Sequence, residues 1–159
     1  MGSRSKTDLA YIAGFLDGDG SLMLQIKKRK DGKAKVRFMC TMCFYQDTRH
    51  EAGLFWIKEI LGIGYISRRN DGMTELRING VAQIKNILKS LIPYIRFKKQ
   101  QALALYKAVG ILEGKTIAHF TQSELKEIVG CIIIIQNNNY VTRKKKTRLE
   151  LFKVLDLTP

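Results

Sequence analysis

Several features are scarce or missing in this sequence of 159 residues, and each excludes a class of protein. No apolar run approaches the roughly eighteen residues that a membrane-spanning helix needs, and the N-terminal segment lacks the apolar core of a secretory signal. Acidic residues are few, with 14 Asp and Glu against 28 Lys and Arg, which leaves a net charge of +14. The sequence therefore predicts a polyanionic partner, and nucleic acid is favoured over a membrane.

Cysteine is also scarce, and the three cysteines cannot all form disulfides, which fits a reducing compartment. Cys40 and Cys43 form a C-x-x-C pattern inside an alternating segment. Residues three apart lie on opposite faces of a strand, so this pattern argues against a zinc site. Repeats, linkers and low-complexity tracts are missing too. We therefore expect one compact domain over residues 1–159 with Cys131 in its core.

Hydrophobic periodicity predicts a helix followed by two β-hairpins with a helix after each. Apolar residues from Leu9 to Leu16 follow helical spacing, and alternating segments 22–27 and 36–45 flank a charged turn at 28–33. Segments 65–70 and 74–78 flank Asp71-Gly72 and predict the second hairpin. We expect helices over 54–61, opened by a Thr48–Glu51 capping box, and over 81–91, capped by Asn79.

The remaining sequence predicts three more helices. One covers 97–112, and two begin at Thr-x-x-Glu patterns, at Thr121 and at Thr147. Ile132–Ile135 is β-branched enough for a buried strand, but helical spacing from Leu125 to Ile135 favours a helix. The fold class is therefore α+β, with the order αββαββα plus C-terminal helices.

Two carboxylates, Asp17 and Asp19, follow the first helix at its C-terminal end. Unpaired carbonyls already make this end negative, so the carboxylates need a cationic partner, and a divalent metal is the simplest one. Gly14 and Gly18 lie four residues apart on the same helix and predict close contact with a second helix. An ordinary buried helix that ends in a polar Asp-Gly turn, stopped by Gly20, is the alternative, and these residues alone leave it open.

Residues 12–20, Ile-Ala-Gly-Phe-Leu-Asp-Gly-Asp-Gly, resemble the LAGLIDADG motif of homing endonucleases. Gly62–Tyr65 and Pro93–Ala102 are similar to later segments of the single-motif, homodimeric group from organellar introns. The resemblance implies a four-stranded, saddle-shaped antiparallel sheet and a location in an organelle, either chloroplast or mitochondrion. It implies Mg²⁺-dependent double-strand cleavage of a long, pseudo-palindromic DNA target by a homodimer.

The resemblance also assigns site residues. Asp19 takes the metal-ligand position with help from the Gly18 carbonyl, Gln46 orients water, and Lys98 stabilises charge. The implied dimer-interface residues are Ile12, Ala13, Gly14, Leu16 and Asp17. His50 stands where this group tends to carry an arginine, so the resemblance does not extend to that contact.

A sheet covered by helices on one side only leaves its other face free for DNA. The residues expected on this open face are Gln25, Lys27, Arg29, Lys35, Arg37, Met39, Thr41, Ser67, Arg69, Glu75 and Arg77. Arginine and lysine match guanine, glutamine matches adenine, and Glu75 can accept from cytosine. A solvated face without a ligand is the alternative, which the nearly uniform positive charge disfavours.

Arg143, Lys144 and Lys145, followed by Lys146, form a basic stretch that predicts phosphate contacts of no sequence preference. A charged loop without a ligand is the alternative. Two other functions stay open for the whole chain, an RNA-binding intron maturase and a catalytically silent DNA-binding protein. The presence of Asp19 together with Gln46 and Lys98 favours the nuclease.

Overall fold

The structure is a computed structural model that describes residues 4–31 and 35–159, so the tip of the predicted first turn lies outside the described residues. Its elements are α1 (Lys6–Asp19), β1 (Gly20–Lys28), β2 (Val36–Asp47), the 3-10 turn η1 (Thr48–His50), α2 (Ala52–Leu61), β3 (Tyr65–Arg68), β4 (Met73–Asn79), α3 (Val81–Leu91), α4 (Lys99–Leu112), the 3-10 turn η2 (Ile117–His119), α5 (Gln122–Asn138) and α6 (Arg148–Val154). The predicted αββαββα order with C-terminal helices is confirmed.

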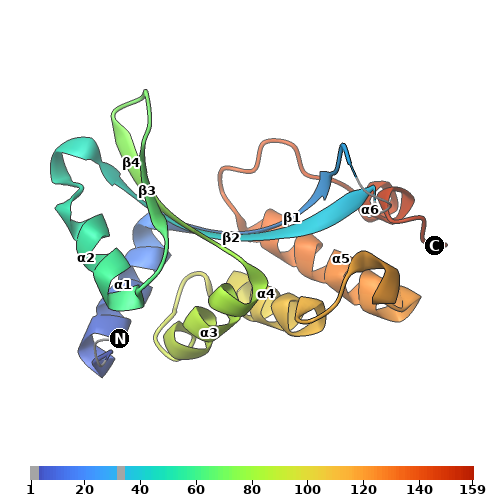
Figure 1. Cartoon of the computed structure of the whole chain (residues 1–159), viewed down its shortest axis with the longest axis horizontal. Coiled ribbons are helices and arrows are strands. Elements are labelled where there is room, and N and C mark those ends of the chain that lie inside the picture. The colour runs from blue at the N-terminus through green and yellow to red at the C-terminus, as the bar shows by residue number, and fades with distance from the viewer. Residues whose placement is uncertain (1–3, 32–34) are drawn as a thin grey trace.

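The four strands form one antiparallel sheet in the order β1-β2-β4-β3. Helices α3, α4 and α5 lie under one face of the sheet, and its long strands β1 and β2 run across them (Figure 1). The side chains that alternate toward these helices are apolar, including Leu22, Leu24, Met42, Phe44 and Leu76, and all are buried. The other face is open, as a sheet with helices on one side requires.

The core is continuous from the motif helix to the C-terminal helices. Ile12 and Leu16 of α1 belong to the same apolar cluster as Ile128 of α5 and Leu151 of α6. The segment with two possible structures is helical: α5 buries Leu125, Ile128, Ile132 and Ile135 at helical spacing, so the strand alternative is wrong. Among the described residues, no helix combines the length and the apolarity needed to cross a membrane.

Two of the four predicted helix caps are confirmed. Thr121 and Thr147 each accept a hydrogen bond from the backbone N–H three residues on, and Glu124 and Glu150 complete the capping boxes. The Thr48–Glu51 box is wrong, because its side chains bind the neighbouring hairpin instead. The Thr48 hydroxyl pairs with that of Thr74 at 2.9 Å, and the Glu51 carboxylate accepts from Thr74 and Arg68.

Asn79 does not cap α3, because its side-chain oxygen accepts from the Thr41 hydroxyl at 2.8 Å. The N-cap is Gly80, at a φ of 107° that favours glycine. Gly20 ends α1, but with a φ of −122° it is extended and starts β1 directly. Its lack of a side chain has a packing reason: a Cβ there would lie 2.5 Å from a Leu16 methyl group and 2.9 Å from the Leu16 carbonyl oxygen.

Candidate active site and nucleic-acid interface

Asp17 lies buried under the start of α4, at 7% exposure. Its carboxylate accepts three successive backbone N–H groups, from Arg96 at 2.6 Å, Phe97 at 3.1 Å and Lys98 at 2.9 Å. These groups precede the first turn of α4, where the helix dipole favours an anion. The cationic partner expected for Asp17 is therefore this helix N-terminus, and Asp17 is not free to bind a metal.

Lys98 comes from the same segment and reaches the end of α1. Its ammonium Nζ donates to the Asp17 backbone carbonyl at 2.5 Å, and the residue is 8% exposed. Burial lowers the pKa of Lys98, while the negative charges of Asp17 and Asp19 act in the opposite direction. The segment that Asp17 anchors thus holds an amine next to the motif, where it can donate to an oxygen that gains charge.

Asp19 is the exposed last residue of α1 and lines a cavity of about 820 Å³ together with Gly18 and Lys98. The cavity extends along β1 to the end of α5 and to residues 139–146. Within residues 4–31 and 35–159, no group of three or more His, Cys, Asp or Glu could hold a metal ion. Asp71 is the other carboxylate that lines the cavity, and it pairs with Arg69, so Asp19 is the cavity carboxylate without an ion-pair partner among the described residues.

Gln46 is not among the residues that line this cavity. Its side-chain oxygen accepts from the backbone N–H of Asp47 at 2.9 Å, at the end of β2. His50 is exposed in the 3-10 turn that follows. The structure therefore brings Gly18, Asp19 and Lys98 together but leaves the water-orienting role of Gln46 as a prediction.

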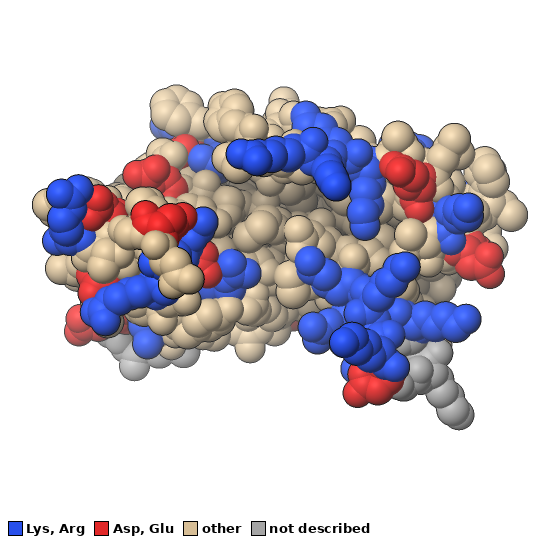
Figure 2. All heavy atoms as spheres, turned by 90° about the horizontal axis from the view of Figure 1, so that it is seen from above, with Lys and Arg blue, Asp and Glu red and all other residues tan. Residues whose placement is uncertain are grey.

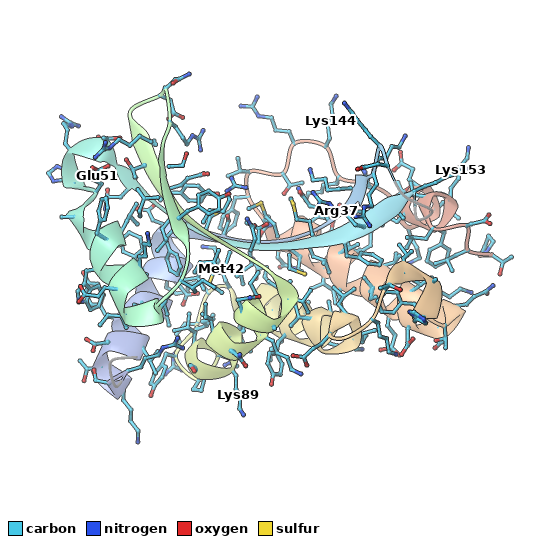
Figure 3. The ribbon with its side chains drawn as sticks, in the orientation of Figure 1. Arg37, Met42, Glu51, Lys89, Lys144 and Lys153 are labelled. Carbon is cyan, nitrogen blue, oxygen red and sulfur yellow. The ribbon has the colours of Figure 1, made fainter. Side chains whose placement is uncertain are left out.

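Lysines and arginines gather in two clusters on the open side of the molecule, with a hollow between them (Figure 2). One cluster is the β1–β2 hairpin, and the other is the segment after α5. Figure 3 shows Lys144 on the same side of the sheet as Arg37, whereas Met42 lies on the helical side and Lys89 points away. Among the described residues, no ion pair involves the following cations: Lys27, Lys28, Arg29, Lys30, Lys35, Arg37, Arg143, Lys144, Lys145 and Lys146.

The second hairpin is different, because its arginines are paired with carboxylates. Arg68 pairs with Glu51, Arg69 with Asp71 and Arg77 with Glu75. Ser67 and Tyr45 lie opposite Glu75 on the neighbouring strands. Glu75 is 8% exposed, and its Oε1 already accepts from Arg77. The prediction that Glu75 accepts from cytosine is therefore wrong while this ion pair is formed.

Thr41 was predicted to project toward DNA, and this prediction is wrong. Thr41 is fully buried, and its hydroxyl donates to the Asn79 side chain. Gln25 and Met39 are half-buried at paired positions of β1 and β2, on the open face as predicted. The open face therefore has a buried polar floor near the β2–β4 junction.

The basic stretch after α5 is held at both ends. The Asn139 side chain donates to the Leu22 carbonyl at 3.0 Å, which ties the stretch to the free edge of β1. The Gln136 amide accepts from the Lys146 backbone N–H at 3.2 Å and donates to its carbonyl. Arg143, Lys144 and Lys145 are exposed between these points, as phosphate contacts require.

Four of the five residues predicted in a dimer interface lie inside the protomer. Ile12, Ala13 and Leu16 have no exposed surface and pack in the core, and Asp17 binds the start of α4. Their placement in an interface is therefore wrong. Gly14 is exposed and so is Gly18, and a Cβ added to either glycine meets nothing within 4 Å in one copy of the chain.

Other residues of the site were not predicted. The Ser21 and Tyr45 hydroxyls hydrogen-bond at 2.9 Å on the open face, and both residues line the cavity beside Asp19. Strand alternation is the signal that could have identified them. Gln136 and Asn139 carry no periodic signal, because both bind backbone groups of segments that are distant in the sequence, Lys146 and Leu22.

Comparison with known proteins agrees with this geometry. A model of the LAGLIDADG endonuclease family matches residues 12–109, more than half of the chain. The DNA endonuclease I-CvuI of Chlorella vulgaris is 37% identical over 93 residues, which are 58% of this chain and 58% of I-CvuI. The DNA endonuclease I-CreI of Chlamydomonas reinhardtii is 28% identical over 152 residues, which are 96% of this chain and 91% of I-CreI.

Solved structures of relatives resemble this fold over nearly the whole chain. The crystal structure of the homing endonuclease I-CvuI with its target, in the presence of 2 mM Ca, superposes with a TM-score of 0.82 at 25% identity and covers 97% of this chain and 98% of that one. I-CvuI with the I-CreI target, in 2 mM Mg and with the DNA not cleaved, gives a TM-score of 0.73 at 26% identity over 97% and 98% of the two chains. The motif, the fold and the family model together show that this chain belongs to the LAGLIDADG endonuclease family.

Proposed function

We propose that two copies of this chain form a site-specific homing endonuclease that makes double-strand breaks in a long, pseudo-palindromic DNA target. The observation that carries this proposal is the placement of Asp19. Its exposed carboxylate lies at the end of a hollow flanked by cations that form no ion pair within residues 4–31 and 35–159, next to a buried lysine. A protein that only binds DNA has no use for an anion that repels phosphate at this position.

The proposed metal is Mg²⁺. The candidate ligands, the Asp19 carboxylate and the Gly18 carbonyl, are oxygens, which suit Mg²⁺ better than a metal that prefers thiolates. A bound divalent ion supplies a water-derived nucleophile and stabilises charge on the phosphate. Lys98 donates to the oxygens that gain charge, and Gln46 is proposed to orient water. Cys40, Cys43 and Cys131 are all buried, and none of them lines the cavity beside Asp19.

A second copy completes the site in this proposal. One copy supplies one Asp19 carboxylate, whereas cutting two strands needs one at each scissile phosphate. Gly14 and Gly18 lie on the exposed side of α1 with open space before them, so the α1 helix of a second copy can approach closely. A two-fold axis between the α1 helices then explains a palindromic target.

The family resemblance also leads us to propose that the protein works in an organelle, either chloroplast or mitochondrion. Cell fractionation with antibody detection tests this proposal. Enrichment in the cytosolic fraction would contradict it.

The decisive experiment uses a plasmid library of random target sites, because the I-CreI target stayed uncleaved in the I-CvuI structure that contains Mg. We expect the chain to linearise a subset of plasmids in Mg²⁺ and to bind the same sites without cutting in Ca²⁺. Asp19→Asn is expected to bind these sites and to cut them at least about 100-fold more slowly, because it loses the charged metal ligand.

Asp156→Asn is the matched control, since Asp156 lies past α6 with a φ of 55°, a backbone conformation that asparagine tolerates. It should cut at the unmodified rate. Binding of DNA without cleavage under any metal would indicate the silent DNA-binding protein, and binding of intron RNA in preference to DNA would indicate the maturase.

A further inference from the structure

Arg77 and Glu75 form an ion pair on the open face that differs from every other ion pair of the described chain. The Arg77 Nε donates to Glu75 Oε1 at 3.0 Å, and Arg77 Nη2 lies 2.9 Å from the same oxygen. The two side chains are 29% and 10% exposed, whereas at least one partner of each other pair is more than 30% exposed. Water therefore competes less for this pair than for a pair on the surface.

The N–H groups of Arg77 that bind Glu75 determine which of its N–H groups remain free for a ligand. A guanidinium has five N–H donors in a planar fork, and Glu75 takes the side made by Nε and one N–H of Nη2. The end of the fork stays free, with two N–H groups on Nη1 and one on Nη2. Two parallel donors at this end match the O6 and N7 acceptors that guanine presents in the major groove.

The residues around Arg77 leave only one direction in which the free end of its guanidinium can meet a ligand. Arg77 lies between Cys43 of β2 and Tyr65 of β3 in the sheet register. Cys43 is fully buried and Glu75 nearly so, and both lie on the same face of the sheet as Arg77. The helices cover the other face (Figure 1), so the free end of the guanidinium can only meet a ligand on the open side.

We propose that Glu75 is a specificity-determining residue that holds Arg77 side-on so that Arg77 reads one guanine in each half of the DNA target. This inference rests on the proposed function and adds a named base contact to it. Glu75 does not touch the base in this arrangement; it limits the positions that the Arg77 side chain can take. A freely rotating arginine would pair with phosphates as readily as with a base edge, because any acceptor satisfies it.

Arg69 supplies the internal comparison. It pairs with Asp71 at 2.8 Å, but both side chains are about half exposed and the pair lies at the hairpin turn. A surface pair of this kind orients its arginine weakly, because water competes for both partners. Removing Asp71 should therefore affect base preference far less than removing Glu75.

The experiment selects bound sites from a random double-stranded DNA library in Ca²⁺ and compares base frequencies among variants. Arg77→Ala identifies the position: guanine preference should disappear at one position in each half-site and persist elsewhere. At that same position we expect Glu75→Leu, which removes both acceptors at similar volume, to lower guanine preference roughly ten-fold, the scale of one bidentate contact. Glu75→Gln, which keeps one neutral acceptor, should lie between Glu75→Leu and the unmodified chain, and Asp71→Asn should match the unmodified chain.

The outcomes separate this inference from the proposed function. Selection of no sites by the unmodified chain overturns both. Selection of sites in which Arg77→Ala changes no guanine overturns the base contact alone. An unchanged guanine preference in Glu75→Leu and Glu75→Gln overturns the role of Glu75, and Glu75→Gln guards against misfolding because it keeps the size and polarity of the native side chain.

Discussion

At the scale of single residues, the two aspartates of one motif have separate roles. Asp17 is buried and satisfies three backbone N–H groups, while Asp19, two residues later, is exposed at the cavity. Sequence spacing could not separate them, because both follow the same apolar pattern. The difference depends on where residues 96–98 lie, almost eighty positions away in the chain.

Asp17 should matter for stability and not only for activity. Asp17→Ala leaves the buried N–H of Lys98 and the part-buried N–H groups of Arg96 and Phe97 without this acceptor, and an orphaned buried donor costs about 1–3 kcal/mol. We expect the free energy of unfolding to fall by about 1–3 kcal/mol. Urea denaturation measures it, and Asp19→Asn is the comparison, because this variant should unfold like the unmodified chain. Equal stability of Asp17→Ala would contradict the anchoring role.

Alanine substitutions at two glycines should change the stability of the fold in opposite directions. A methyl group at Gly20 would collide with Leu16, so Gly20→Ala should destabilise the fold by about 1–3 kcal/mol. Gly53 lies in α2, and a methyl group added there would meet nothing within 4 Å, so Gly53→Ala should stabilise by about 1 kcal/mol through helix propensity. Thermal unfolding of both variants tests the pair, and a stabilised Gly20→Ala would refute the packing argument.

At the scale of elements, α1 has two faces with different partners. Its apolar residues pack into the core, while Gly14 and Gly18 lie on the exposed side. The sequence predicted close helix contact at Gly14 and Gly18, whereas the family resemblance also placed the apolar residues Ile12, Ala13 and Leu16 in the interface. Periodicity could not correct this, because it marks a buried face without saying which molecule buries it.

Gly14→Leu should weaken the proposed dimer by placing a bulky side chain between two α1 helices. We expect sedimentation to show a shift from two chains toward one and far-UV circular dichroism to stay unchanged, because Gly14 is exposed and a Cβ there meets nothing within 4 Å in the protomer. Gly110→Leu is the control, since Gly110 is an exposed glycine of α4 with equally open space. A dimer that tolerates Gly14→Leu would exclude this helix face from the interface.

The helix caps show how local signals compete with tertiary partners. The Thr-x-x-Glu patterns of α5 and α6 cap as predicted, and Glu124 does so with one carboxylate oxygen while the other pairs with Lys115. The same pattern at Thr48 fails, since Arg68 and Thr74 of the second hairpin offer Glu51 charged and hydroxyl donors. A capping box is therefore decided by what folds beside it.

At the scale of the whole molecule, the charge of +14 is distributed unevenly. In the part of the chain that the structure describes, cations without an ion-pair partner lie on β1, on β2 and on residues 143–146, while the arginines of the second hairpin are paired with carboxylates. Phosphate contacts should therefore come mainly from the β1–β2 hairpin and residues 143–146, while open-face residues of the hairpin stay candidates for base contacts.

The salt dependence of DNA binding tests this division. Each phosphate contact adds about 0.9 to the slope of log affinity against log salt, so Lys144→Gln with Lys145→Gln should lower the slope by about 1.8 per chain. Lys89→Gln with Lys107→Gln removes the same charge from the helical side and should leave the slope nearly unchanged. Equal slopes for the two double variants would show that residues 144 and 145 make no phosphate contact.

The sequence by itself determined the family, the order of the elements, the open basic face and the candidate ligand Asp19, because motif spacing and hydrophobic periodicity are local properties of the chain. Only the tertiary structure decided that Asp17 anchors α4, that Thr41 is buried, that Gly14 and Gly18 rather than their apolar neighbours are exposed, and that Glu75 holds Arg77. These facts depend on which distant groups meet, and a side chain with several possible partners takes the one that the fold brings nearest.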